Sequence, residues 1–184
     1  MISRQEAIEL LESHIKAENM RKHCLASEAV LRAVARRLGK NEDEYGLAGL
    51  LHDIDVEITN ANPKTHGPYA EKLLKGKVND EMLDAIVMHN EMATGLPRTN
   101  TFQHALAAGE TITGLITATA LVYPDKKLAS VKPKSVTKRM KQKAFAASVK
   151  RENILECEEI GIPINEFAEL SLNAMCTISD ELGL

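Results

Sequence analysis

Apolar residues recur along most of the chain at the three- and four-residue spacing that is typical of amphipathic helices. Ser3 and Glu6 form the pattern of a helix-capping box, and a stripe of Ile8, Leu11 and Ile15 follows it. Glycine, proline and asparagine interrupt the pattern between segments. We therefore expect about seven to nine helices, drawn from the segment after Ser3 and from residues 20–38, 43–52, 65–75, 80–89, 101–122, 135–149, 152–160 and 166–182.

No segment alternates apolar and polar residues as a strand does, so the expected fold class is an all-α helical bundle. The chain has 184 residues, of which 44% are hydrophobic, and this suits a single domain over residues 1–184 with a substantial core. No apolar run approaches the ~20 residues of a membrane span, and the first residues carry no signal-peptide core. We expect a cytoplasmic protein that does not bind membranes. Its cysteines (Cys24, Cys157 and Cys176) contain no Cys-x-x-Cys pair and are expected to be buried thiols rather than disulfides.

The formal net charge of −3 conceals an uneven distribution. Residues 126–151 contain ten lysines and arginines and no acidic residue, which leaves 13 basic and 26 acidic residues, a net of −13, elsewhere. Such a segment either rims a pocket for an anionic substrate or forms a solvated basic face. Nucleic-acid binding is disfavoured, because Phe145 is the only aromatic residue among these charges and the whole chain is acidic.

Several histidines lie where their helices face inward. His23 and His89 each share a helix face with apolar residues, so both are expected to point into the core. His52 and Asp53 are adjacent at the end of an apolar helix, and His66 begins the next one. Imidazole combined with carboxylate suits zinc, iron, manganese or nickel better than magnesium alone. Each histidine taken singly is also compatible with a hydrogen-bonded core residue.

Glu110 shares a face with apolar and small residues in the middle of the most apolar helix. No lysine or arginine lies within ten residues, so burying this carboxylate is costly unless a metal ion or a distant lysine pairs with it. His14 and His104 fit ordinary hydrogen-bonded residues. His104 precedes Glu110 by six positions and lies on a different face of the helix.

The chain resembles the HD-domain superfamily of metal-dependent phosphohydrolases. The segments that carry this resemblance are MRKHCLASEAV, LAGLLHDIDVE, THGPYAEKLL, AIVMHNE and ALAAGETITGLI. They present a lone histidine, a His-Asp doublet and a distal acid in the order of that superfamily. The resemblance implies a metal-binding core over about residues 20–120 and a helical extension over about 125–184, the latter similar to an uncharacterised bacterial and archaeal branch.

The resemblance implies a ligand set made of His23, His52, Asp53, His66, His89 and Glu110. Asp53 would bridge if two metals bind, and it would orient the attacking water as the catalytic residue. Glu110 stands where the superfamily usually has Asp, one methylene shorter. Asp55 follows the doublet in place of the common glycine, and it either supports a ligand or is simply an acid at a helix end.

The cofactor that the resemblance implies is one or two divalent transition-metal ions (iron, manganese, zinc, nickel or cobalt), with magnesium also open. Such a metal lowers the pKa of bound water toward ~7 and makes hydroxide available at neutral pH. Two ions would carry more positive charge than Asp53 and Glu110 neutralise, and the surplus would match a phosphate dianion. Loop cations expected to hold substrate phosphate are Arg98, Lys126, Lys127 and Lys132, with Lys134 in the same loop.

The leading hypothesis is therefore a metal-dependent phosphohydrolase that hydrolyses a small phosphate ester, with a nucleotide as the favoured substrate. An alternative is an HD-type di-iron oxygenase, because the full set of four histidines and two acids is present. A second alternative is a non-catalytic HD interaction module, which the Glu at position 110 favours. The expected partner is a small phosphorylated substrate, and a homo-oligomer is left open.

Overall fold

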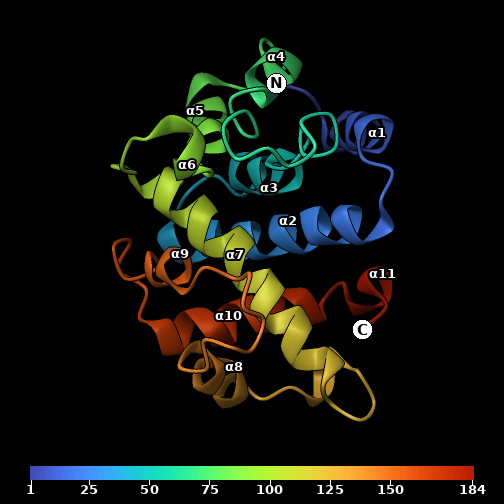
Figure 1. Ribbon diagram of the computed structural model, residues 1–184, viewed down its shortest axis with the longest axis vertical. Coiled ribbons are helices and arrows are strands. Elements are labelled where there is room, and N and C mark those ends of the chain that lie inside the picture. Colours follow the sequence, from blue (N-terminus) through green and yellow to red (C-terminus); the bar gives the residue numbers. More distant parts are fainter.

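The computed structural model describes residues 1–184 and consists of helices joined by turns and loops, without a strand (Figure 1). The predicted all-α class is confirmed. The elements are α1 (Arg4–His14), α2 (Glu18–Leu38), α3 (Glu42–Leu51), α4 (Ala70–Leu74), α5 (Asp80–Met88), α6 (Glu91–Thr94), α7 (Thr101–Leu121), the 3₁₀ helix η1 (Leu128–Ser130), α8 (Pro133–Met140), α9 (Arg151–Leu155), α10 (Ile164–Cys176) and α11 (Ser179–Leu182).

The eleven α-helices exceed the expected seven to nine because α6 was not predicted and because the predicted helix 166–182 divides into α10 and α11. Helices α4 and α9 have five residues each, and α6 and α11 have four. The predicted capping box at Ser3 and Glu6 is present at the start of α1, where each side chain bonds the other residue's backbone N–H. A second capping box, between Asn100 and Gln103, begins α7.

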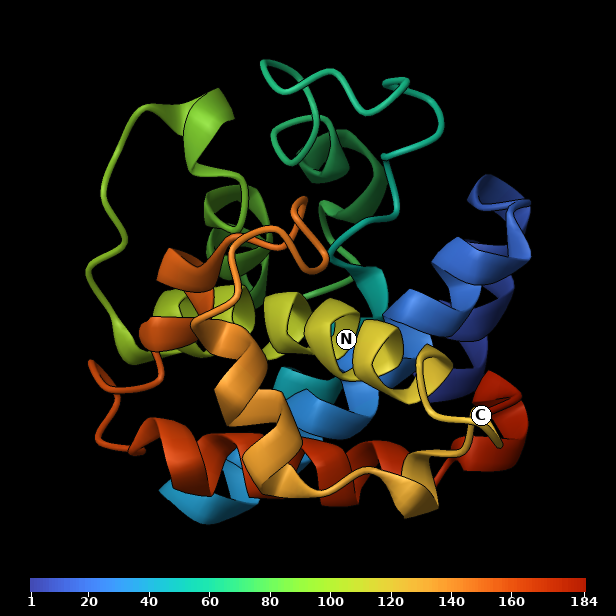
Figure 2. The ribbon, with the colours of Figure 1, turned by 60° about the horizontal axis from the view of Figure 1, so that its bottom comes forward.

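Helices α2 and α7 have 21 residues each and form the centre of the molecule, with α7 crossing α2 obliquely (Figure 1). Helix α3 packs on α2, α5 packs on α7, and α10 runs along α2 in the lower part of the turned view (Figure 2). The buried apolar side chains form one continuous core of 42 residues. The core therefore extends across both halves of the chain.

Gly49 allows the close approach of α3 to α2. A Cβ at this position would lie 2.7 Å from the backbone oxygen of Ser27, nearer than real Cβ contacts come. Because α3 lies so close to α2, the residues that follow it, His52 and Asp53, are carried to the side of His23 on α2. Helix packing thus determines where the histidines meet.

Three predicted helices are much shorter than expected, and one of them, 152–160, is α-helical only within α9, which ends at Leu155. Residues 65–69 form turns, and only Ala70–Leu74 of the predicted 65–75 helix is α-helical. The predicted 135–149 helix ends as α8 at Met140, and residues 141–149 form turns that include Ala146 at a φ of +45°. Here the guanidinium of Arg151 donates hydrogen bonds to several of the segment's carbonyl groups. These bonds replace the regular ladder that an uninterrupted helix would form.

No helix combines the length and the apolar character needed to cross a membrane. The three cysteines are free thiols, as expected, with Cys24 and Cys157 buried and Cys176 partly buried. Burial raises the pKa of the Cys157 thiol to about 12, and the nearby Glu158 charge acts in the same direction.

Candidate metal centre

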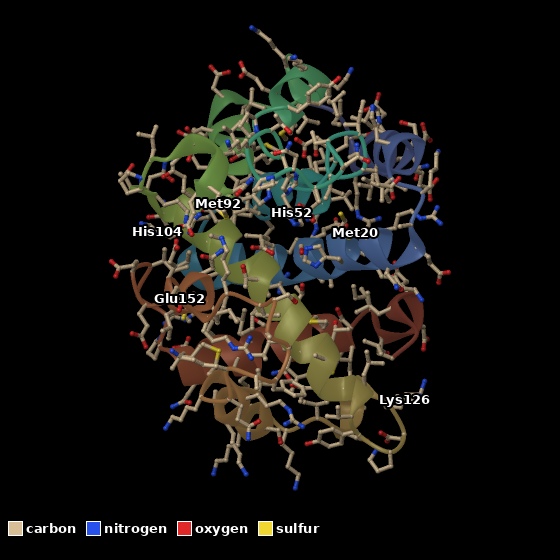
Figure 3. The ribbon with its side chains drawn as sticks, in the orientation of Figure 1. Met20, His52, Met92, His104, Lys126 and Glu152 are labelled. Carbon is tan, nitrogen blue, oxygen red and sulfur yellow. The ribbon has the colours of Figure 1, made fainter.

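Four histidines meet around Asp53 in the interior, at the point where α2, α3, α5 and α7 approach one another. His23 comes from α2, while His52 and His89 are the residues at which α3 and α5 end. His66 lies in the turns before α4. Figure 3 labels His52 in the middle of the molecule, between α3 and α2. The structure therefore brings together, from four segments of the chain, the histidines that the sequence analysis assigned to one site.

The two carboxylate oxygens of Asp53 face different pairs of histidines. Oδ2 lies 3.6 Å from Nε2 of His23 and 3.4 Å from Nε2 of His52. Oδ1 lies 3.1 Å from Nε2 of His66 and 3.4 Å from Nε2 of His89. Within each pair the two Nε2 atoms are 3.1 Å apart. Asp53 thus stands between two half-sites, each made of two imidazoles and one oxygen.

Every one of the four imidazoles is anchored through Nδ1. His52 and His89 donate to the backbone oxygens of Gly49 and Ile86, at 2.8 and 2.5 Å. His23 Nδ1 lies 3.0 Å from the Thr113 hydroxyl, whose own proton goes to the Glu110 carbonyl. Because backbone oxygens only accept, Nδ1 carries the proton at least in His52 and His89. The Nε2 lone pairs are then directed at the centre, as metal ligation requires.

Asp55 holds the fourth imidazole. Its Oδ1 accepts a hydrogen bond from Nδ1 of His66 at 2.9 Å, and its Oδ2 accepts from the backbone N–H of Gly67 at 2.8 Å. The residue is completely buried. Of the two roles that the sequence left open for Asp55, the geometry matches the support of a ligand. A carboxylate behind a ligating histidine is a common arrangement in metal sites.

The charges of the centre strongly perturb its pKa values. Burial opposes ionisation of Asp53, yet His52, His66 and His89 hold the pKa of its carboxyl well below the usual range. Burial would lower the pKa of His66, but Asp53 and Asp55 raise it to about 10. Burial lowers the pKa of His23 to about 4, and the neighbouring His52 adds to the effect. A buried carboxylate that stays ionised among histidines favours the binding of a cation.

Glu110 lies at the edge of the centre rather than within it. Its Oε2 is 3.8 Å from Nε2 of His23, and its carboxylate accepts a hydrogen bond from the hydroxyl of Thr111. Burial raises the pKa of this carboxyl. Ligation by Glu110 stays a prediction, because the side chain is near His23 but outside both half-sites.

The donor set fits a pair of divalent metal ions. His23, His52 and Asp53 present ligand atoms that lie within 4.8 Å of one another, and Asp53, His66 and His89 do the same. The two groups share only Asp53, so its carboxylate would bridge two ions if both groups held one. Neutral imidazoles with one carboxylate suit iron, zinc, manganese, nickel or cobalt.

A cavity of about 290 Å³ opens onto the centre. His23, Asp53, His66, His89 and Glu110 form its floor. Its walls come from three other parts of the chain and consist of Asn90, Thr111, Gly114, Ser148, Val149, Lys150 and Asn153. The wall residues Ser148, Val149 and Lys150 belong to the turns between α8 and α9, and sequence reasoning did not single them out. The signal available was the basic segment 126–151, whose last lysine, Lys150, lies in the cavity wall.

Arg98 was expected to hold substrate phosphate, and its guanidinium is engaged by other groups of the chain. It is buried and donates to Glu156 at 2.7 Å, to Glu91 at 3.1 Å, and to the backbone oxygens of Met88 and His89. These bonds tie the ends of α5 and α6 to α9. These contacts give Arg98 a structural role beside His89, and its binding of phosphate stays a prediction.

Lys126, Lys127 and Lys132 were also expected to hold phosphate, and the structure places none of them in the cavity wall. Lys126 lies beyond the end of α7, far from His52 (Figure 3). Lys127 and Lys132 flank the short helix η1. Binding of phosphate by these lysines stays a prediction, because α7 is 21 residues long and carries the loop that follows it away from the centre.

His14 and His104 lie outside the centre, in agreement with the sequence analysis. His14 Nδ1 is 3.0 Å from the Leu10 carbonyl, and His104 Nδ1 is 2.8 Å from Glu156 Oε2. A larger cavity of about 780 Å³ lies elsewhere, between α2 and α10. Its arginines are paired with glutamates, as Arg4 is with Glu28 at 2.6 Å, so this arginine is not free to bind an anionic ligand.

Comparison with known protein families gives one result that bears on this centre. A family model described as the HD domain matches residues 20–121, which include every residue of the floor of the cavity. No curated protein and no solved structure matches the chain.

Proposed function

The chain belongs to the HD-domain family, and from the geometry of its centre we propose that it is a phosphohydrolase using two divalent metal ions. Members of this family are generally metal-dependent hydrolases. The observation that carries the proposal is the division of the two Asp53 oxygens between the His23–His52 pair and the His66–His89 pair. The proposed substrate is a small phosphate ester, and a nucleotide is the ester that the family resemblance favours.

Each group of the centre has a definable task in this reaction. The metals supply Lewis acidity and a bound water of lowered pKa. Asp53 provides buried negative charge between the two half-sites and an acceptor oxygen for each of them. The four imidazoles, fixed through Nδ1, offer Nε2 without having to reorient. Such preorganisation lowers the cost of building charge in the transition state.

The test combines metal content with turnover. Tag-free protein is analysed for metals and then assayed, after loading with manganese, cobalt, nickel or iron, against a panel of phosphomonoesters and phosphodiesters that includes nucleotides. We expect about two equivalents of metal and metal-dependent release of phosphate or alcohol. Full occupancy with no hydrolysis of any ester would contradict the proposal.

A di-iron oxygenase is the second candidate, and the histidine-rich composition of both half-sites favours it, since imidazole suits iron. Anaerobic purification separates the two functions. A mixed-valent EPR signal together with substrate-dependent oxygen uptake would support the oxygenase, and hydrolysis without oxygen uptake would support the phosphohydrolase.

A further inference from the structure

The segment between α8 and α9 reaches back to the metal centre. In both ribbon views the orange chain after α8 lies beside α7 (Figures 1 and 2). Gly114 of α7 allows the segment to approach α7 closely, because a Cβ at this position would lie only 3.2 Å from Cγ2 of Val149. The segment thereby places Ser148 and Lys150 in the wall of the cavity.

Arg151 gives this segment its shape. Its guanidinium donates to the backbone oxygens of Ala146 and Val149 at 2.7 Å each, and to that of Phe145. Longer bonds reach the oxygens of Arg139 and Gln142. A single side chain at the centre of the turns therefore fixes where residues 148–150 lie.

Lys150 is the only cationic side chain in the cavity wall. Its Nζ has one long contact, 3.5 Å to Glu91 Oε1, and its side chain is 46% exposed. Arg98, which bonds the backbone oxygen of His89, is saturated by Glu156, Glu91 and backbone oxygens. An anionic group bound at the metals therefore has Lys150 as its available cationic partner from the protein.

The rest of the wall is polar and small. Val149 is its only hydrophobic residue, and it contains no Phe, Tyr or Trp. Ligand cavities usually measure about 300–1,000 Å³ and are mostly apolar, so 290 Å³ with this lining suits a compact hydrophilic ligand. Recognition of a nucleobase commonly relies on stacking against an aromatic ring, for which this wall has no side chain.

We propose that Lys150 binds the phosphate of the substrate and that the substrate is a small hydroxylated phosphomonoester, a phosphorylated sugar or polyol, rather than a nucleotide. This inference rests on the proposed hydrolytic function and narrows its substrate. The Ser148 hydroxyl, which has no hydrogen-bond partner of its own within the chain, donates to a hydroxyl of the ligand.

The first arm of the test measures binding without turnover. Inorganic phosphate is titrated into manganese-loaded wild type, Lys150→Ala, Lys150→Arg and Lys126→Ala. Loss of a charge-assisted contact is expected to weaken phosphate binding about tenfold in Lys150→Ala, with substantial recovery in Lys150→Arg. Lys126→Ala is the matched control and should equal wild type. Wild-type affinity in Lys150→Ala would overturn the assignment of Lys150.

The second arm compares ribose 5-phosphate with adenosine 5′-monophosphate, which adds a base to the same phosphorylated sugar. We expect kcat/KM for the nucleotide to be no higher than for the sugar phosphate. A preference for the nucleotide of more than about tenfold would show that a base is recognised and would overturn the substrate class. If no ester is cleaved while phosphate binding still depends on Lys150, the hydrolytic function fails and the anion site stands.

Discussion

Asp55 holds His66 so that the imidazole bridges two carboxylates. Nδ1 of His66 lies 2.9 Å from Asp55, and Nε2 lies 3.1 Å from Asp53. The His-Asp doublet therefore has a supporting carboxylate two residues after its aspartate, and this carboxylate acts through the turn that contains His66. This arrangement directs Nε2 of His66 at the half-site that it shares with His89.

The first prediction follows from this contact. Asp55→Asn preserves the size of the side chain but removes the charge behind His66. Losing such a supporting partner typically costs 10–100-fold in metal affinity, so we expect about that loss at the His66–His89 half-site. Competition with a chromophoric chelator measures it. Asp180→Asn, a matched change in α11, serves as the control, and two ions retained at wild-type affinity in Asp55→Asn would contradict the assigned role.

The histidine cluster was predictable in its members because helical spacing identifies inward faces without any knowledge of the fold. His23 and His89 are recognisable in this way, and His52 and Asp53 are recognisable as an adjacent pair at the end of an apolar helix. The division of Asp53 between two pairs was not predictable from spacing. It depends on the distance between α2 and α3, which Gly49 and Ser27 set by close packing.

The residues proposed to bind phosphate were less predictable from the sequence. Sequence reasoning favoured lysines near loop signals, yet Lys126 is carried away from the centre by the length of α7. Lys150 was counted only within the basic segment, because residues 135–149 have a helical apolar pattern. Contacts of Arg151 with distant carbonyl groups override that pattern, and no local property of the sequence encodes them.

The second prediction concerns His52, which is completely buried and lies at the junction of α3 with the centre. His52→Ala removes one of two imidazoles from the His23 half-site, so we expect loss of bound metal and of activity together while the helical content is retained. Elemental analysis and far-ultraviolet circular dichroism measure these effects. His14→Ala, outside the centre, should keep its metal. Retention of full metal content in His52→Ala would show that the centre is assigned wrongly.

The third prediction addresses Glu110, whose Oε2 lies 3.8 Å from Nε2 of His23. Glu110→Gln keeps the shape and removes the charge. If the carboxylate completes the His23–His52 half-site, metal affinity there should fall at least about tenfold, while the His66–His89 half-site keeps its ion. Metal titration resolves the two steps. Unchanged affinity at both steps would exclude Glu110 from the ligand set and leave it as a residue of the cavity floor.

The fourth prediction concerns the packing that supports the centre. In Gly49→Ala the new methyl group would meet the backbone of Ser27, which cannot rotate away. We expect a loss of about 1–3 kcal/mol in the free energy of unfolding. In Gly109→Ala the new methyl group meets the Leu31 side chain, which can move, and the better helix propensity of alanine offsets part of the cost. Urea denaturation should rank Gly49→Ala as the less stable variant, and the reverse order would contradict the close-packing argument.

The fifth prediction tests whether Arg151 organises the wall that carries Lys150. Arg151→Met keeps much of the apolar stem of the side chain and removes every hydrogen bond to the backbone of residues 139–149. Without these bonds the carbonyl groups must turn to water, so we expect faster amide exchange confined to residues 139–150. The ligands on α2, α3 and α5 are independent of this segment, and metal content should therefore stay at the wild-type level. Phosphate affinity should fall toward that of Lys150→Ala, because the lysine is no longer held beside the metals.

Lys143→Met, an exposed change in the same turns, controls for loss of charge. Unchanged exchange in Arg151→Met would mean that packing of Val149 on Gly114, rather than the guanidinium, holds the segment in place.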